Sequence, residues 1–405
     1  LKGTTATYST SKKILATVKG LKSGLKVSDG KINGVSVSGS KITLSKAALG
    51  TDKVTVSKGY TLALGKDVTQ SKTTNDWKLN KTTATYKQTT TAGYKLVNNS
   101  ITHLEKSTKT LATVKGLKSG LKVSNGKING VSVSNSKITL SKAALGTDKV
   151  TVSKGYTLVL GKDVTKSKTT KDWKLKKTTA TYKQTTTAGY KLANNSITHL
   201  EKSSKTLATV NGVKNLDGIS LKKKVVTLKA SELNRKVSVS GKGYEFNFAA
   251  GDYKKSSIMG SKNADIITSR GKNISINTGE GNDTIKILGT ATKVNSGAGN
   301  DIIESNGTGK YSLWGGVGND TLYSGDGADK FYYAKGDGKD TIFGFDDKDT
   351  LTLDNIDFVA TYSQKKQAVT FKVDGGSITL KDFNATTFHV NNDTYQIIGS
   401  KFKKK

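Results

Sequence analysis

The chain has 405 residues, enough for two or three domains, and a formal net charge of +35. It has no Cys, which excludes a disulfide framework and thiol chemistry, and it has no Pro. No apolar run approaches the roughly 18 residues that a membrane-spanning helix needs.

The positive charge is confined to the first part of the chain. Residues 259–405 hold 18 Lys and Arg against 18 Asp and Glu, whereas residues 1–258 hold 48 against 13. Only two of the 66 basic residues are Arg. Lysine is a hydrated point charge, which suits a solvated surface or loose contact with anionic polymers more than bidentate recognition. Both interpretations stay open for the lysine-rich part.

Residues 1–258 are an internal repeat. Residues 15–88 and 111–184 differ at only six of 74 positions, at an offset of 96. We therefore divide the chain into 1–110 (a truncated first unit and the start of the second), 111–206 (a full unit), 207–258 (a degenerate third unit), 259–353 and 354–405. Because the sequence has no initiator Met and begins inside a unit, we expect it to be part of a longer product.

Each 96-residue unit reads as short β-strands. Alternating, Thr-rich segments such as 149–152 and 156–160 are punctuated by Asn-Gly and Asn-Asn turn signals. We expect eight or more strands per unit, arranged either as small β-domains or as a solenoid. Near-identical β modules in series are typical of spacers and adhesive stalks. The units are also similar to the tandem Thr/Lys-rich repeats found in large secreted bacterial proteins.

A different repeat occupies residues 278–353. It reads T-G-E-G-N-D-T-I, S-G-A-G-N-D-I-I, G-G-V-G-N-D-T-L, S-G-D-G-A-D-K-F, then G-D-G-K-D-T-I and F-D-D-K-D-T-L-T-L. Glycines allow the chain to turn with positive φ, the Asp adds a hard anionic oxygen, and the apolar residue two positions on begins a short strand. Such oxygens are the ligands that Ca²⁺ prefers.

This nonapeptide resembles the calcium-binding β-helix repeat of RTX proteins. Over roughly residues 260–353 the chain resembles the carboxy-terminal part of a secreted RTX, or hemolysin-type calcium-binding, protein. The resemblance implies a right-handed parallel β-roll in which two nonapeptides form one turn and glycine-rich loops stack on two opposite edges. The fold class we predict is all-β, with tandem β-rich modules followed by this roll and a short β cap.

The two edges of the predicted roll differ. Counting by eighteen, with one insertion before Gly315 and two more before Lys335, one edge carries Asp265, Asp283, Asp301, Asp320 and Asp340. The other edge has Ile274, Thr292 and Lys310 or Tyr311 where Asp is expected, and recovers only with Asp329 and Asp349. The intervening nonapeptides keep their inward positions, which are Ile276, Val294 and Leu313.

In the RTX family each ion is shared by successive loops on one edge, so the resemblance implies about four calcium ions and at most five. The four pairs are Asp283 with Asp301, Asp301 with Asp320, Asp320 with Asp340, and Asp329 with Asp349. A fifth ion would use Asp265, whose loop G-S-K-N-A-D lacks the second glycine. The glycines that would supply carbonyl oxygens or the turn are Gly279, Gly281, Gly297, Gly299, Gly316, Gly318, Gly325, Gly327, Gly336 and Gly338.

The stacked carboxylates predict a calcium switch. At the inter-strand spacing of about 4.7–4.9 Å, neighbouring carboxylates repel by about 1 kcal/mol in water and by roughly 3–4 kcal/mol at an effective dielectric of 20. Strands with one small inward residue each bury too little to overcome this repulsion and the ordering entropy. Extracellular modules bind calcium at about 10⁻⁴–10⁻³ M, so we expect the roll to be unfolded in cytosol and folded outside.

The remaining sequence offers no catalytic constellation. His103, His199 and His389 are expected to be structural, and neither H-E-x-x-H nor G-x-S-x-G occurs. Trp77, Trp173 and Trp314 are expected to pack in a core or at an edge. Residues 354–405 contain strand-like segments and the hairpin signal D-G-G at 374–376, and we expect them to cap the roll. By resemblance, a type I secretion signal also occupies this position.

Three functional hypotheses follow. The first is a secreted, non-enzymatic, adhesin-like surface or matrix protein of bacterial origin. The second is the secretion and spacer portion of a larger RTX enzyme or toxin whose catalytic domain lies upstream. The third is a module that binds anionic cell-surface or matrix polymers through its lysines, since no motif for sequence-specific nucleic-acid reading is found. The oligomeric state and the ligand of the repeats are left open.

Overall fold

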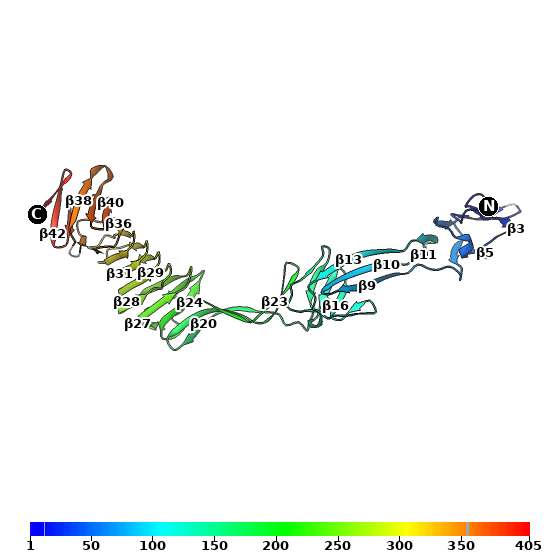
Figure 1. The fold of residues 1–405 in the computed structure, drawn as a ribbon, viewed down its shortest axis with the longest axis horizontal. Helices are drawn as coiled ribbons and strands as arrows, with labels where there is room; N and C mark the ends of the chain where they lie inside the picture. Colours follow the sequence, from blue (N-terminus) through cyan, green and yellow to red (C-terminus); the bar gives the residue numbers. More distant parts are fainter. Residues whose placement is uncertain (12, 354–355) are drawn as a thin grey trace. The chain divides into compact units, whose positions relative to one another are not determined.

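The computed structural model describes residues 1–11, 13–353 and 356–405, and the chain is all-β apart from four short 3₁₀ turns (Figure 1). It divides into two compact units: residues 1–168 with 187–201, and residues 169–186 with 202–405. No helix within the described ranges is long and apolar enough to span a membrane. The 3₁₀ turns are η1 (Lys46–Ala48), η2 (Lys142–Ala144), η3 (Ala230–Glu232) and η4 (Gln364–Lys366).

Two modules of the same design form the first unit. The first module has a five-stranded sheet in the order β1 (Ala6–Thr10), β2 (Lys13–Lys19), β7 (Val54–Val56), β12 (Ser100–Leu104) and β11 (Gly93–Val97). Its other strands are the hairpin β3 (Val27–Ser28) and β4 (Lys31–Ile32), and the sheet β5 (Val35–Ser38), β6 (Lys41–Leu44) and β8 (Thr61–Leu64). A separate core of buried apolar side chains, including Leu21, Ile42 and Ile101, holds this module together.

The second module repeats this plan with one more strand in its main sheet. The sheet order is β22 (Gly189–Ala193), β23 (Ser196–Leu200), β18 (Val150–Val152), β13 (Ser107–Lys115), β10 (Thr83–Thr90) and β9 (Thr73–Asn80). The second sheet contains β14 (Val123–Ser124), β15 (Lys127–Ile128), β16 (Val131–Ser134), β17 (Lys137–Leu140) and β19 (Thr157–Leu160). Its core includes Trp77, Leu117 and Ile138.

The sequence repeat and the structural module are out of phase. Strands β9, β10 and β13 pair with one another in the second module, yet the hairpin β11–β12 between β10 and β13 pairs with β7 of the first module. One 96-residue unit therefore contributes strands to two modules. The boundaries that we drew from the sequence repeat do not coincide with the boundaries of the structural modules. The sequence was compatible with either small β-domains or a solenoid in this region. The structure contains discrete β modules here.

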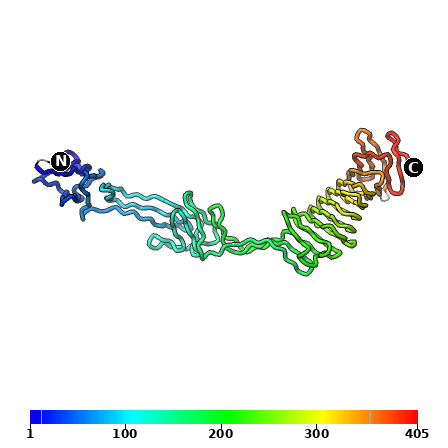
Figure 2. The backbone as a smooth tube through the Cα atoms, turned by 180° about the vertical axis from the view of Figure 1, so that it is seen from behind, coloured from blue at the N-terminus to red at the C-terminus, as the bar shows by residue number. Residues whose placement is uncertain are grey.

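The second unit begins with antiparallel strands and then becomes a parallel coil. Parallel pairing starts with β26 against β28, so the coil includes residues of the degenerate third repeat. The entry strands are β20 (Thr169–Lys176), β21 (Thr179–Thr186), β24 (Ser203–Val213), β25 (Ile219–Lys222), β26 (Val225–Leu228), β27 (Leu233–Ser240) and β28 (Glu245–Met259). Figure 2 shows the successive turns that follow as regularly stacked rungs.

The predicted parallel β-roll is confirmed. Its rungs are β29 (Ile266–Glu280), β30 (Thr284–Ile287), β31 (Lys293–Ala298), β32 (Ile302–Ser305), β33 (Ser312–Val317), β34 (Thr321–Tyr323), β35 (Lys330–Tyr333), β36 (Lys339–Phe343) and β37 (Thr350–Leu353). On one face the inward residues in register are Ile267, Ile285, Ile303, Leu322 and Ile342. On the other they are Ile276, Val294, Leu313, Phe331 and Leu351, so the eighteen-residue spacing and the insertions were predicted correctly.

The strands of the roll bury more and larger side chains than the one small inward residue per strand that we expected. Ile285 and Ile287 are both buried on β30, and Phe331 and Tyr333 are both buried on β35. These side chains belong to a core that is continuous with Phe246 and Phe248 of β28. The expectation of a minimal interior was wrong in this respect, because strands of four residues place two side chains inward and aromatic residues occupy several of these positions.

The predicted cap is built from β38 (Phe358–Ser363), β39 (Ala368–Val373), β40 (Gly376–Lys381), β41 (Thr387–Val390), β42 (Asp393–Ile398) and β43 (Lys401–Lys404). Strands β39 and β40 form the hairpin expected at D-G-G, with Gly375 at φ +81°. Strand β40 pairs in parallel with β36, and β41 pairs in parallel with β37. The cap thus covers the last strand of each face of the roll.

Candidate calcium-binding ladders

The glycine-rich loops stack so closely that side chains do not fit. Gly297 and Gly299 have φ values of +102° and +143°, a region that favours glycine. A methyl group on Gly297 would overlap the carbonyl oxygen of Gly279, and one on Gly299 would overlap that of Gly281. The same holds one turn later, where Gly316 and Gly318 lie over Gly297 and Gly299. Columns of main-chain carbonyls therefore run along this edge.

Five aspartates form a column beside these loops, which we call the first ladder: Asp265, Asp283, Asp301, Asp320 and Asp340. All five side chains are buried. The backbone N–H of each aspartate donates to Oδ1 of the aspartate one turn later, at 2.8 Å from Asp265 to Asp283, 2.7 Å from Asp283 to Asp301, 2.8 Å from Asp301 to Asp320 and 3.0 Å from Asp320 to Asp340. The spacing predicted from the sequence places these residues together.

The other carboxylate oxygen of the three central aspartates has no partner. Oδ2 of Asp283, Asp301 and Asp320 is buried and accepts no hydrogen bond from the protein. A buried anionic oxygen without a donor is costly, so such groups are normally paired or bound to a metal. Three of them on successive turns, beside a column of carbonyl oxygens, fit the all-oxygen coordination of Ca²⁺.

Main-chain oxygens would supply much of that coordination. In the part of the chain that the structure describes, no three Asp, Glu, His or Cys side chains converge on a common point. Ca²⁺ takes six to eight oxygens and accepts backbone carbonyls among them. The carbonyl oxygens of the glycine columns are the further oxygens that lie on this edge.

Burial makes the first ladder resist ionisation. Desolvation raises the pKa of Asp320 to about 7 and that of Asp340 to about 8, and the neighbouring carboxylates add to both shifts. The pKa values of Asp283 and Asp301 are also raised, chiefly by burial. A cation bound beside these groups would favour the ionised form and reverse this penalty.

Asp265 differs from the rest of the ladder. Its Oδ2 accepts hydrogen bonds from the backbone N–H and the hydroxyl of Ser261, at 2.6 and 3.0 Å. Its Oδ2 is therefore held by the protein's own loop, and that loop lacks the second glycine. This residue fits the end of the column better than it fits a further ion.

On the opposite edge, uncharged side chains replace the aspartates over three turns. Ile274, Thr292 and Tyr311 are buried there, and Tyr311, one of two candidates for this position, occupies it. The backbone N–H of Tyr311 donates to Oδ1 of Asp329 at 2.9 Å, and that of Asp329 donates to Oδ1 of Asp349 at 2.8 Å. We call Asp329 and Asp349 the second ladder.

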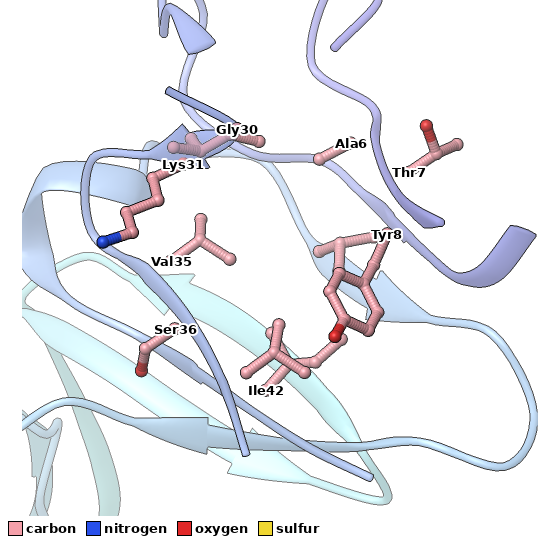
Figure 3. Close-up of a pocket in the computed structure, with 11 residues that line it drawn as sticks. Ala6, Thr7, Tyr8, Gly30, Lys31, Val35, Ser36 and Ile42 are labelled. Atoms are coloured by element: carbon pink, nitrogen blue, oxygen red, sulfur yellow. The ribbon is translucent and has the colours of Figure 1, made fainter. Parts of the chain in front are cut away.

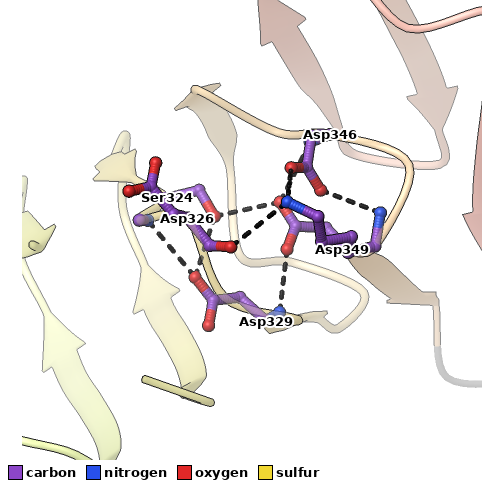
Figure 4. A network of polar contacts seen from close by, with 7 residues as sticks. Ser324, Asp326, Asp329, Asp346 and Asp349 are labelled. Atoms are coloured by element: carbon purple, nitrogen blue, oxygen red, sulfur yellow. Dashed lines mark hydrogen bonds and ion pairs between the residues drawn. The ribbon is translucent and has the colours of Figure 1, made fainter. Parts of the chain in front are cut away.

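A serine joins the two carboxylates of the second ladder (Figure 4). The Ser324 hydroxyl lies 2.9 Å from Oδ2 of Asp329 and 2.9 Å from Oδ2 of Asp349. It has one proton and can donate to only one of them at a time. Desolvation by burial raises the pKa of Asp349 to about 7 and also raises that of Asp329. The backbone N–H of Asp346 donates to Asp349 Oδ2 at 3.0 Å.

Sequence reasoning missed Ser324 and one further carboxylate near the first ladder. Asp337 is buried, and its Oδ2 accepts from Trp314 Nε1 at 2.8 Å and from the backbone N–H of Ala334 at 2.7 Å. It raises the pKa of both Asp320 and Asp340. The only feature of the sequence that points to Asp337 is its place at the third position of the hexapeptide K-G-D-G-K-D. Other copies of the hexapeptide have Glu, Ala, Val or Asp at this position.

The Asn of the G-N-D triplets was also missed. Oδ1 of Asn282 accepts from the backbone N–H of Asn300 at 2.9 Å, and Oδ1 of Asn300 accepts from that of Asn319 at 2.8 Å. A third bond of the same kind joins Lys339 to Asn319 at 2.9 Å. This amide column runs beside the first ladder and fixes the same register. The feature of the sequence that could have revealed this column is the recurrence of Asn directly before Asp.

The three histidines contact neighbouring side chains. His103 Nδ1 lies 3.2 Å from Glu105 Oε1, and the ring packs on Tyr94 at 5.0 Å. His199 repeats this arrangement, and His389 Nδ1 contacts the Thr394 hydroxyl at 3.0 Å.

The sequence was compared with known protein families and with curated proteins. The model of the RTX calcium-binding nonapeptide repeat (4 copies) matches residues 312–338 and 336–355. No curated protein matches the chain. The matched residues include Asp320, Asp329, Asp340 and Asp349, and the register of the roll continues the same ladder upstream to Asp283 and Asp301.

Proposed function

From the RTX calcium-binding repeats that the chain carries, we propose that it is a secreted protein whose β-roll is locked by calcium after export. The observation that carries this proposal is the row of three buried, unpartnered carboxylate oxygens on Asp283, Asp301 and Asp320. Bound calcium supplies positive charge and a coordination centre for these oxygens. The chain's own contribution is to hold the oxygens in line through the hydrogen-bonded ladder.

The proposed ions lie between successive turns. Three would be held on the first edge, between Asp283 and Asp301, Asp301 and Asp320, and Asp320 and Asp340. A fourth would be held by Asp329 and Asp349. Carbonyl oxygens of the glycine loops complete each site, and these include Gly325, Gly327, Gly336 and Gly338. Asp265, which begins the column and whose loop lacks the second glycine, would not add a fifth.

The proposal explains why the roll would fold outside the cell. Without a cation, the carboxylates are either repelled by one another or protonated, and both states oppose a folded, ionised ladder. Extracellular calcium modules work at about 10⁻⁴–10⁻³ M, which is far above cytosolic calcium. Residues 354–405, in which β40 and β41 pair with the last strands of the roll, would then serve both as cap and as a type I secretion segment.

We assign the repeat modules a non-enzymatic role as a spacer or adhesive stalk. The shared strands between the first and second modules support this role, because β11 and β12 return to the first module while β10 and β13 stay in the second. Two modules joined by several chain passes are harder to pull apart than two joined by one linker. Further units in the full reading frame would favour the stalk, and a non-repetitive upstream domain would favour an enzyme or toxin.

Calcium titration tests the calcium proposal. Isothermal titration calorimetry of the metal-free protein should count about four ions, and magnesium at the same concentration should not reproduce the heat. Eight or more ions would contradict a ladder confined mainly to one edge. Absence of saturable binding at millimolar calcium would overturn the proposal.

A second candidate function is binding of anionic polymers by the modules. Among the ion pairs between described residues, none joins a lysine of residues 1–258 to a carboxylate. Those residues hold 48 basic against 13 acidic side chains, so their charge is available to a partner. Retention on heparin should fall steeply as salt rises, and a neutral dextran matrix is the control. A protein that passes through heparin at low salt would exclude this function.

A further inference from the structure

An open hollow of about 340 Å³ lies on the outer side of strands β29, β31, β33 and β35 of the roll. The inward residues of these strands are Ile276, Val294, Leu313 and Phe331. Because side chains alternate along a strand, the residues next to these point outward. The outward side chains that line the hollow include two amides, two aromatic rings and a lysine, and they are Asn277, Asn295, Trp314, Tyr332 and Lys293.

The amides and the rings form one column along the roll. Asn277 pairs in register with Asn295, Asn295 with Trp314, and Trp314 with Tyr332. Neighbouring strands lie about 4.7–4.9 Å apart, so each side chain of the column is one strand spacing from the next. This spacing is close to the length of one ring in an extended chain of pyranose sugars. The column therefore presents a line of contact points to such a chain.

The indole of Trp314 is held in place by the protein itself. Trp314 is 37% exposed, and its Nε1 donates to Oδ2 of Asp337 at 2.8 Å. Asp337 is buried and also accepts from the backbone N–H of Ala334, so this acceptor is itself fixed. The second ring of the column, that of Tyr332, is 39% exposed. A ring that is already fixed loses little freedom when a ligand lies on it, which favours binding.

Asn295 leaves a hydrogen-bonding atom unused. Its Oδ1 is buried without a partner among the described residues. Buried amide oxygens normally accept a hydrogen bond. A hydroxyl-rich ligand in the hollow supplies such donors, and Asn277 offers a second amide one strand away.

The charge on this face is positive. Among the described residues that line the hollow, none is Asp or Glu. Lys293 is followed in register by Ser312 and then by Lys330, and both lysines are exposed. No ion pair between described residues involves either lysine. Their ammonium groups are therefore available to carboxylates of a ligand.

Two other places with exposed aromatic residues lack this combination. On the opposite face of the roll, the Tyr323 ring stacks on Phe343 with centroids 5.0 Å apart, and Lys381 Nζ lies 5.3 Å from the Phe343 centroid. Those rings are already in contact with groups of the protein. In the first module, a hollow of about 510 Å³ contains Tyr8 (Figure 3). Among the described residues that line it, Tyr8 is the one aromatic residue and none has an amide side chain.

We propose that this face of the roll is a binding site for an acidic polysaccharide. The C–H groups of its pyranose rings lie against the faces of Trp314 and Tyr332, whose π-electrons attract them. Its hydroxyl groups bond to the amides of Asn277 and Asn295, and its carboxylates pair with the two lysines. The unpaired lysines and the absence of a carboxylate from the described lining favour an acidic chain over a neutral one. This site is separate from the polymer binding considered for the modules.

The test follows Trp314 itself. The chain has three Trp, so the full-chain variant Trp77→Phe/Trp173→Phe leaves Trp314 as the reporter, and ligand bound by the modules does not contribute. The probes are hyaluronan hexasaccharide and trigalacturonate, in millimolar calcium. Each should shield Trp314 from acrylamide quenching in a saturable manner. Chitohexaose, which is neutral, should bind about tenfold more weakly because the ion pairs are lost. Poly-L-glutamate, which has carboxylates but no sugar rings, should leave the quenching unchanged.

Substitutions on the two faces of the roll locate the site. Tyr332→Ala removes one ring and should weaken binding about fivefold. Tyr323→Ala is its matched control, because Tyr323 is 38% exposed on the opposite face, and binding should be unchanged. Lys293→Gln should weaken binding about threefold and make it less sensitive to salt, since one exposed ion pair is removed.

Far-UV circular dichroism of each variant in calcium checks that the roll is folded, so a loss of calcium-dependent folding is distinguished from a loss of the site. Failure of both probes to shield Trp314 in folded protein would overturn the proposal. Equal effects of Tyr332→Ala and Tyr323→Ala would also overturn it, as would shielding by poly-L-glutamate. Equal binding of hyaluronan hexasaccharide and chitohexaose would overturn the preference for an acidic chain.

Discussion

At the scale of single residues, the carboxylates of the roll do two tasks with two oxygens. Oδ1 of Asp301 accepts the backbone N–H of Asp283 and sets the register, while Oδ2 is buried without a donor. The first task is structural, whereas the second is the one that we propose a cation satisfies. This division allows the two tasks to be separated by substitution.

The substitution Asp301→Asn should separate the role of Oδ1 in setting the register from the proposed role of Oδ2 in binding a cation. The amide oxygen still accepts from Asp283, but the anionic ligand is lost from the two proposed sites that share Asp301. We expect calorimetry to count about two ions fewer and the calcium-dependent part of the stability to fall by about 3 kcal/mol, as when one member of a buried charged pair is removed. The calcium-free protein should become slightly more stable, since a repelling carboxylate is gone.

The matched control is Asp265→Asn at the end of the same ladder. Its carboxylate is already occupied by Ser261, so the ion count should stay the same. Equal losses from the two substitutions would refute the shared role of Asp301.

The pH dependence of the calcium-free roll follows from the raised pKa values. Asp320 and Asp349 have pKa values of about 7 and Asp340 of about 8 when folded, against about 3.9 when unfolded. The folded state therefore holds more protons between about pH 4 and pH 8, and its stability falls as the pH rises through that window. Circular dichroism of the metal-free protein should therefore show less β-structure from the roll at pH 8 than at pH 5.

Calcium should show the opposite trend, because binding displaces those protons and so tightens as the pH rises. A calcium-free β-structure content that is constant or increases between pH 5 and pH 8 would contradict the assignment of these groups.

At the scale of elements, the glycine columns set the rise of the roll. Gly299→Ala places a methyl group against the carbonyl of Gly281 at a backbone φ of +143°. We expect a loss of at least about 2 kcal/mol of stability in calcium, measured by urea unfolding, because both overlap and backbone strain are introduced. Gly336→Ala is the control: its φ is +93°, but the space around it is open, so only about 1 kcal/mol should be lost. Similar losses of stability from the two substitutions would show that backbone strain, and not overlap with the stacked carbonyl, determines the cost of the added methyl group.

The sequence predicted the roll well because a repeat fixes its own register. The Asp and the apolar position recur together, so Ile285 and Ile303, or Val294 and Leu313, could be aligned by counting. Asp337 and Ser324 could not be found in this way, since their contacts depend on loops where insertions break the count.

At the scale of the whole molecule, two kinds of stability coexist. Each module of the first unit has its own apolar core and does not contain the ladders. The second unit has a continuous core, but the turns that join its strands are lined with buried carboxylates. Removing calcium should therefore affect residues 279–353 and leave the modules folded.

Hydrogen exchange resolved by mass spectrometry tests this account most directly. The full chain would be compared in millimolar calcium and in excess chelator, with magnesium as the control cation. We expect the amides of residues 279–353 to be protected only in calcium, while those of residues 15–160 are protected equally in all three conditions. Equal protection of residues 279–353 with and without calcium would contradict the claim that a cation holds the ladder together.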